Sequence, residues 1–252
     1  MSDEQEFIKK RFVELARKSY GSAMYTFTDF LGLDEQSLFS QVRREISHVK
    51  YKAFGGADGT ERIMIRFGDE DELGWSEDFP IKILECSARA EKWADRLTHR
   101  DFLGAILNLG IERSEIGDIV IRDKTAFVFV SERIAPFIKE NLSRAKHTDL
   151  LVREIDELPS GALYTTQERT VQCNSPRIDA LVARVFCLSR DDSQALFSKG
   201  LVFVDGRETE SCSRELKAGE TVSVRGKGRF VFHGMVSLSK KGKLNLKVEV
   251  FI

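Results

Sequence analysis

The chain has 252 residues and a mass of 28.6 kDa, and 42% of its residues are hydrophobic while 31% are charged. This composition, with only 4 prolines and no low-complexity segment, excludes a largely disordered chain. No run approaches the roughly 20 apolar residues that a membrane-spanning helix needs, and the start MSDEQEFIKKRF lacks the apolar core of a signal peptide. We therefore expect a cytoplasmic monomer of two to three domains without a membrane partner.

The formal net charge of −1 hides an asymmetry between two parts of the chain. Residues 169–252 contain 15 Lys and Arg against 9 Asp and Glu, whereas residues 1–168 contain 24 against 31. A basic C-terminal third favours a polyanionic partner. The charge alone is equally compatible with an uneven surface that binds nothing.

The cysteines and histidines lack the spacing of a metal site. Cys86, Cys173, Cys187 and Cys212 contain no CxxC pair, and His48, His99, His147 and His233 stand apart from one another. We expect free thiols, no metal and no cofactor.

The N-terminal domain, expected over residues 1–76, begins with helical spacing. Phe7, Ile8, Phe12 and Leu15 recur at three- and four-residue steps and predict one apolar helix face. After the apolar cluster Phe30, Leu31 and Leu33, Asp34 is a candidate N-cap for a helix over residues 35–46, with Leu38, Phe39, Val42 and Ile46 on one face.

Two short alternating runs follow, residues 49–54 and 62–67, on either side of the GGADG segment at 55–59. They predict a β-hairpin with a long glycine-rich turn. The simplest interpretation of its glycines is a turn with positive φ angles, and an RNA-facing loop is the alternative. The acidic segment at 68–80 marks the expected domain boundary.

The middle domain, expected over residues 77–158, alternates strands and helices. Strands are predicted at 81–88, 117–123, 125–132 and 150–158, and helices at 100–110 and 134–148. This β-α-β-β-α-β order indicates a ferredoxin-like or RRM-like domain.

Three local features of this domain have structural explanations. Phe127 and Phe129 alternate on one strand and are expected to pack under the helices rather than to stack on RNA bases. Thr98 and Asp101 have the spacing of a capping box, which accounts for them better than catalysis at His99 does. Asn108 before Gly110 is expected to end the helix.

Residues 159–174 are expected to form a linker that includes a strand, followed by the last domain over residues 175–252. Residues 178–186 predict a first helix there, and Ser189 a cap for a second helix that Gly200 ends. The segment LVFVDGRE at 201–208 predicts a strand entering a turn at Asp205 and Gly206, and AGETVSVRG at 218–226 predicts another strand.

This last arrangement resembles the S4-type RNA-binding domain, an αα-turn-β module with a β extension. The matching segments are Arg177 to Leu181, Ser189 to Ala195, Lys199-Gly200, Val202 to Gly206, and Gly219 to Val222. In this module helix N-termini and cationic side chains suit phosphate oxygens. The expected RNA-binding residues are Arg177, Ser189, Arg190, Gln194, Lys199, Arg207, Arg225, Lys227 and Arg229. For the acidic Asp179, by contrast, an internal ion pair with Arg190, which Arg177 could join, is the preferred interpretation.

Over nearly its full length the chain resembles the YlmH family of bacterial S4-domain proteins. The residues that carry this resemblance include Phe27 to Leu31, Phe54-Gly55-Gly56 with Glu61-Arg62, Leu97 to Ala105 with Leu107 to Gly110, and Gly117 to Ile119. The resemblance implies a non-enzymatic factor of ribosome-associated quality control. Its implied partners are RNA of the large ribosomal subunit, the tRNA of stalled complexes and further quality-control factors.

Two alternatives remain open at this stage. The first is an RNA-modifying enzyme of the pseudouridine synthase or methyltransferase type, although the GxGxxG loop of methyltransferases is missing from the sequence. The second is a protein-interaction adaptor linked to cell division, in which the acidic N-terminal two-thirds binds protein.

Overall fold

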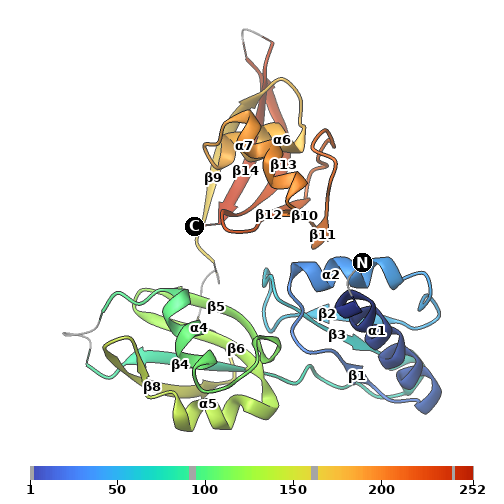
Figure 1. The fold of residues 1–252 in the computed structure, drawn as a ribbon, viewed down its shortest axis with the longest axis vertical. Coiled ribbons are helices and arrows are strands. Elements are labelled where there is room, and N and C mark those ends of the chain that lie inside the picture. The colour runs from blue at the N-terminus through green and yellow to red at the C-terminus, as the bar shows by residue number, and fades with distance from the viewer. Residues whose placement is uncertain (1–2, 91–94, 160–163, 240–241, 252) are drawn as a thin grey trace. The chain divides into compact units, whose positions relative to one another are not determined.

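The computed structural model describes residues 3–90, 95–159, 164–239 and 242–251, and the chain forms two compact units, 1–163 and 164–252 (Figure 1). Both units combine helices with sheets, which confirms the α+β class. The further division at residue 76 stays a prediction. None of the described helices is both long and apolar enough to cross a membrane.

The first unit starts with helix α1 (Asp3–Ser22), which buries Phe12, Leu15 and Ala16. The prediction that Phe7 shares this face is wrong, because its side chain is 70% exposed. Phe7 lies five positions before Phe12, and at 3.6 residues per turn that spacing places the two on different sides of a helix.

Helix α2 (Leu33–Val42) both begins and ends earlier than the predicted range of 35–46. Its N-cap is Gly32, whose N–H donates to the Glu35 carboxylate at 2.7 Å, so the prediction of Asp34 as the cap is wrong. The predicted apolar face is confirmed, since Leu38, Phe39, Val42 and Ile46 are all buried.

The predicted hairpin is present as strands β2 (Tyr51–Phe54) and β3 (Met64–Phe67), paired antiparallel. A third strand, β1 (Thr26–Phe27), pairs with β3 and was missed because two residues carry no periodic signal. The acidic segment contains a short helix, α3 (Glu70–Leu73), that was also not predicted.

The glycines of the hairpin turn are required by packing. Gly56 has a φ of 99°, and a Cβ there would collide with the Phe129 ring. A Cβ on Gly55 would collide with Thr60 and with the Arg62 carbonyl. This supports the structural interpretation of the turn, in which the glycines allow close approach to the middle sheet.

Arg62 joins this hairpin to the following sheet. Its Nε donates to the Ile116 carbonyl at 2.9 Å, and its Nη2 donates to the Phe30 carbonyl at 2.7 Å. The backbone N–H groups of Glu61 and Arg62 donate to the Asp118 carboxylate at 2.8 and 3.0 Å. Residues that are distant in sequence but carry the family resemblance therefore meet at one junction.

The middle part of the first unit has its strands in the order β5-β6-β4-β8-β7, all antiparallel. The predicted succession of elements is observed with one correction: the second helix ends at Asn141, and β7 follows it. The bounds are β4 (Ile81–Ala88), α4 (His99–Leu107), η2 (Arg113–Glu115), β5 (Ile116–Arg122), β6 (Thr125–Ser131), η3 (Glu132–Ile134), α5 (Ala135–Asn141), β7 (Arg144–Ala145) and β8 (Thr148–Ile155).

The two faces of this sheet are both covered. Val128 packs with Phe102 of α4 and Ile138 of α5 in one core cluster. Phe127 and Phe129 are buried as predicted, at 3% and 0% exposed, but they belong to the other face of β6. Their expected position under the helices is therefore wrong, and Phe129 lies against Gly56 and Gly117 instead.

The second unit has one sheet in the order β11-β10-β12-β13-β14-β9, with α6 and α7 packed on it (Figure 1). The expected linker supplies β9, which pairs along its whole length with β14. The bounds are β9 (Thr166–Cys173), α6 (Ile178–Val185), α7 (Arg190–Ser198), β10 (Val202–Val204), β11 (Arg207–Glu208), β12 (Thr221–Val224), β13 (Gly228–Leu238) and β14 (Leu244–Phe251).

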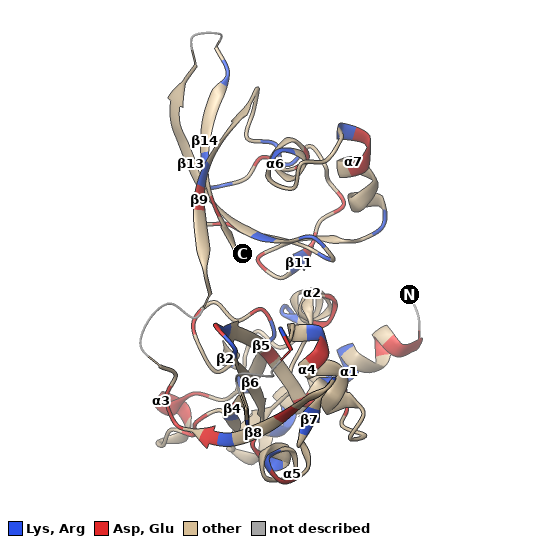
Figure 2. Cartoon of the chain, turned by 90° about the vertical axis from the view of Figure 1, so that its left-hand side faces the viewer, with Lys and Arg blue, Asp and Glu red and all other residues tan. Residues whose placement is uncertain are grey.

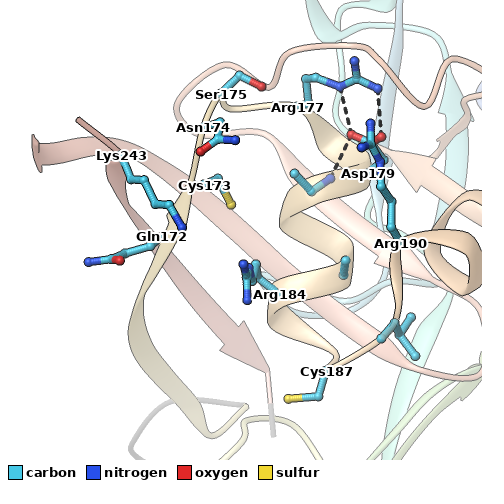
Figure 3. Close-up of a pocket in the computed structure, with 13 residues that line it drawn as sticks. Gln172, Cys173, Asn174, Ser175, Arg177, Asp179, Arg184, Cys187, Arg190 and Lys243 are labelled. Atoms are coloured by element: carbon cyan, nitrogen blue, oxygen red, sulfur yellow. Dashed lines mark hydrogen bonds and ion pairs between the residues drawn. The ribbon is translucent and has the colours of Figure 1, made fainter. Parts of the chain in front are cut away.

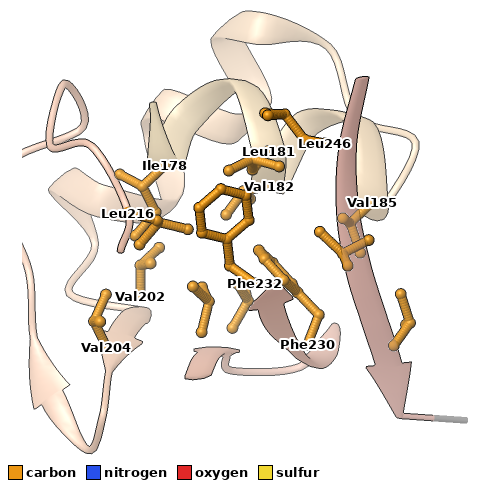
Figure 4. Packing of buried hydrophobic residues seen from close by; sticks show 14 of the residues in the cluster. Ile178, Leu181, Val182, Val185, Val202, Val204, Leu216, Phe230, Phe232 and Leu246 are labelled. Carbon is orange, nitrogen blue, oxygen red and sulfur yellow. The ribbon is translucent and has the colours of Figure 1, made fainter. Parts of the chain in front are cut away.

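The local signals of this unit act as predicted. The Ser189 hydroxyl accepts the Asp192 N–H at 3.0 Å and caps α7, and Gly200 follows that helix with a φ of 64°. Asp205 and Gly206 both have positive φ in the turn between β10 and β11. The core beneath α6 includes Leu181, Phe230 and Leu246, each fully buried (Figure 4).

Candidate nucleic-acid interface

A cleft of about 780 Å³ lies between β9 and α6 in the second unit (Figure 3). Its walls come from the end of β9, the exposed side of α6, the first residue of α7 and the start of β14. Four cationic side chains line it: Arg177, Arg184, Arg190 and Lys243. Two of these, Arg177 and Arg190, are among the residues expected from the sequence.

Arg177 is engaged inside the protein. Its Nε and Nη2 donate to the two oxygens of Asp179 at 3.0 and 2.8 Å. An internal ion pair of Asp179 is therefore confirmed, but its partner is Arg177 and not the expected Arg190. Burial alone would raise the pKa of Asp179, but the hydrogen bonds and charge of Arg177 outweigh it and hold the pKa below its usual value. The pair neutralises one cation at the edge of the cleft, and Asp179 also accepts the Ala180 N–H at 2.9 Å in the first turn of α6.

The other three cations of the cleft, Arg184, Arg190 and Lys243, are not neutralised in this way. Across the described residues, none of them forms an ion pair. Arg184 and Arg190 are exposed on α6 and at the start of α7, and Lys243 is exposed beside β14. A concave surface with three uncompensated positive charges attracts a polyanion.

Arg190 is followed at once by acidic residues. Figure 2 shows the basic start of α7 next to Asp and Glu in red, and the residues concerned are Asp191 and Asp192. Asp192 accepts the Ser189 hydroxyl at 2.6 Å and belongs to the helix cap. These carboxylates make the rim less positive at α7 than along α6.

Ser189 and Gln194 have internal partners rather than free polar groups. The Ser189 hydroxyl both accepts and donates within the α7 cap. Gln194 hydrogen-bonds the Asp179 side chain, and this bond contributes to the lowered pKa of Asp179. Neither residue lines the cleft, and their hydrogen bonds support Asp179 and the start of α7.

The remaining expected cations lie outside the cleft lining. Lys199 is the exposed C-cap of α7, and Arg207 is exposed on β11. Arg225 and Lys227 are exposed in the turn between β12 and β13, where the Arg225 N–H donates to the Leu201 carbonyl at 2.9 Å. That bond places the turn beside the end of α7, so Lys199 and the cations of this turn form a second group outside the cleft.

Arg229 differs from these residues because aromatic rings hold its side chain. Its guanidinium carbon lies 4.3 Å from the centre of the Tyr164 ring and 3.9 Å from that of Phe251. Such cation–π stacking fixes the side chain across the end strands of the sheet. Arg229 is therefore placed to stabilise the sheet edge.

Sequence reasoning missed Arg184 and Lys243. Arg184 could have been predicted, because it lies seven residues after Arg177 and residues at that spacing share one face of a helix. Lys243 is brought to the cleft by the antiparallel pairing of Leu244 with Cys173, a register that no local pattern reveals. The same holds for the polar residues Gln172 and Asn174 at the end of β9.

In the middle part of the first unit, the Thr98–Asp101 capping box is confirmed. The Thr98 N–H and hydroxyl both donate to Asp101 Oδ2 at 2.7 Å. These bonds, with a lesser contribution from Lys146, lower the pKa of Asp101 to about 2. Asn108 is the C-cap residue of α4, as predicted, and Gly110 follows with a φ of 83°.

Comparisons with known proteins identify the family. Residues 75–157 match the model of a family described as a putative RNA-binding domain in YlmH. The ribosome-associated protein quality control protein P2 of Bacillus subtilis (strain 168) is 30% identical over 254 residues, which cover 98% of this chain and 95% of the relative. The chain belongs to the YlmH family.

A solved structure is also similar to this YlmH-family protein. It is the cell division protein ylmH from Streptococcus pneumoniae, 19% identical, with a TM-score of 0.49 over 62% of this chain and 93% of that one.

Proposed function

We propose that this YlmH-family protein is a non-enzymatic, cytoplasmic RNA-binding factor that associates with the large ribosomal subunit and with the peptidyl-tRNA of stalled translation complexes. The coarser part of this proposal, an RNA-binding and ribosome-associated role, is supported by the family description and by the name of the Bacillus subtilis relative. The finer part, large-subunit RNA and tRNA, rests on the family resemblance of the sequence.

The observation that carries the proposal is the cleft between β9 and α6. Arg184, Arg190 and Lys243 converge on a concave surface of the part of the chain that is richest in Lys and Arg. Gln172, Asn174 and Ser175 add neutral donors and acceptors at one wall. Cations with neutral polar groups are the set that contacts phosphate and sugar in RNA complexes.

The architecture supports the same proposal. The succession α6, α7, β10, turn, β11 in the second unit resembles the S4-type module expected from the sequence, and the strand order β5-β6-β4-β8 in the first resembles an RRM-like sheet. We assign the RNA contact chiefly to the cleft cations. Lys199, Arg207, Arg225 and Lys227 are assigned to outlying phosphates, and Arg177, Ser189, Gln194 and Arg229 to holding the interface in shape.

The proposal is tested by measuring RNA affinity as a function of salt. Full-length protein is titrated into a fluorescein-labelled RNA hairpin, and binding is followed by fluorescence anisotropy at a series of salt concentrations. We expect the logarithm of the association constant to fall linearly with the logarithm of salt, with a slope of about −0.7 to −0.9 per phosphate neutralised. Absence of binding at low salt would refute an RNA-binding function.

A further inference from the structure

A second groove, of about 580 Å³, lies in the middle part of the first unit. One wall is the exposed side of α4, and the other is the segment from the end of α5 through β7. Arg100, Arg144 and Lys146 are exposed at its edges, and Asn108 and Asn141 add amide groups. The groove lies on the helix side of the sheet, away from the buried Phe127 and Phe129.

The groove is positive although residues 1–168 are acidic as a whole. Its only lining carboxylate among the described residues is Asp101, which lies 3.0 Å from Lys146 Nζ and is already held by Thr98. Arg144 is 4.0 Å from Asp149, a weak pair at an exposed position. Arg100 has no ion-pair partner in the part of the chain that the structure describes.

Gly104 on the groove wall is not explained by packing. It lies inside α4, and a Cβ there would meet no atom within 4 Å. Glycine in a helix interior is less favourable than alanine because it loses more backbone entropy on folding. Its use here lowers the wall of the groove and leaves open space beside the helix backbone.

We propose that this groove binds the sugar–phosphate backbone of RNA, as a second contact in addition to the cleft between β9 and α6. The inference rests on the proposed function and names a further site for it. Two arginines and neutral amides suit phosphodiester oxygens and ribose hydroxyls. The groove also lies within residues 75–157, which match the putative RNA-binding domain. The sheet face on which RRM domains stack bases is covered here, which leaves the helix side for RNA.

The test uses Gly104→Gln and the double variant Arg100→Ala with Arg144→Ala in the full-length protein, with the labelled RNA hairpin as the probe. Gly104→Gln fills the groove without a charge change, and we expect about tenfold weaker RNA binding together with an unchanged or higher midpoint of thermal unfolding. The double variant should lower the magnitude of the salt slope by about one to two. A glycine with only a structural role would not combine weaker binding with retained stability.

The control is Arg11→Ala with Arg17→Ala on α1, which removes the same charge from side chains that are 62% and 69% exposed. RNA affinity equal to wild type in both groove variants, while a variant of the cleft still weakens binding, would overturn the second site and leave the proposed function intact. If the groove variants lose binding to a fluorescein-labelled poly-glutamate peptide while their RNA binding is unchanged, the groove binds a protein partner. That result would overturn the proposed RNA site. A wild-type protein that binds no RNA would overturn both.

Discussion

Replacing Arg184 and Arg190 together with alanine is expected to weaken RNA binding by about a hundredfold at low salt and to reduce the magnitude of the salt slope by about two. Both side chains line the cleft, and neither has an ion-pair partner among the described residues, so their positive charges are available to phosphate. Neither is buried, so the fold does not depend on them. The measurement is the salt titration of full-length wild type and variant on the same labelled RNA hairpin.

Two further variants make this prediction specific. Arg177→Ala should act mainly on stability, because it leaves the Asp179 carboxylate without its ion-pair partner at a site only 3% exposed. Lys227→Ala, in the turn between β12 and β13, should reduce affinity only slightly. If the Arg184 and Arg190 variant keeps the wild-type salt slope, while Lys227→Ala reduces it, RNA binds at the turn and the cleft is not the site.

Replacing Arg62 with alanine is expected to destabilise the first unit by about 2–4 kcal/mol. The guanidinium donates to the carbonyls of Phe30, Ile116 and Arg113, which would each lose a charged donor. Burial lowers the pKa of Arg62, and burial together with the nearby charge of Arg62 lowers that of Arg113 to about 10. Arg62→Ala would remove the electrostatic repulsion between Arg62 and Arg113. We expect the loss of the three hydrogen bonds to carbonyl groups to destabilise the unit by more than this removal stabilises it.

The measurement is urea unfolding of the full chain, followed separately for the two units by hydrogen exchange and mass spectrometry. Protection should fall in the strands β3, β5 and β6 and stay unchanged in β12 to β14. Arg62→Lys keeps the positive charge but lacks the planar guanidinium group that donates to three carbonyls at once. Its destabilisation should therefore lie between zero and that of Arg62→Ala. Arg17→Ala is the surface control, and an Arg62→Ala effect as small as this control would mean that the junction contributes little.

The elements that sequence predicts well are those with a local signal. Helix α7 shows this, since Ser189 caps it and Gly200 ends it, as does the turn at Asp205 and Gly206. The failures depend on contacts between distant residues. The side of β6 on which Phe127 lies is decided by which neighbouring segment covers each face of the sheet. The ends of short elements such as β1 and β7 depend on their pairing with longer strands.

The candidate site divides in the same way. Arg190 could be expected from its place at the start of a capped helix, and Arg184 from the face it shares with Arg177. Lys243 enters the cleft only through the register of β14 with β9, and Arg229 is removed from the site by stacking on Tyr164 and Phe251. Charge and spacing in one segment thus indicate which module is expected to bind RNA, whereas the strand pairing determines which cations converge.

Sedimentation with large ribosomal subunits tests the central claim most directly. Full-length protein and the Arg184 and Arg190 variant are each centrifuged through sucrose with purified large subunits, with and without bound peptidyl-tRNA, at low and at physiological salt. We predict that wild type cosediments in a salt-sensitive manner, more strongly when peptidyl-tRNA is present, and that the variant is largely lost from the subunit fraction. Equal cosedimentation of wild type and variant, or no binding of either, would contradict the account.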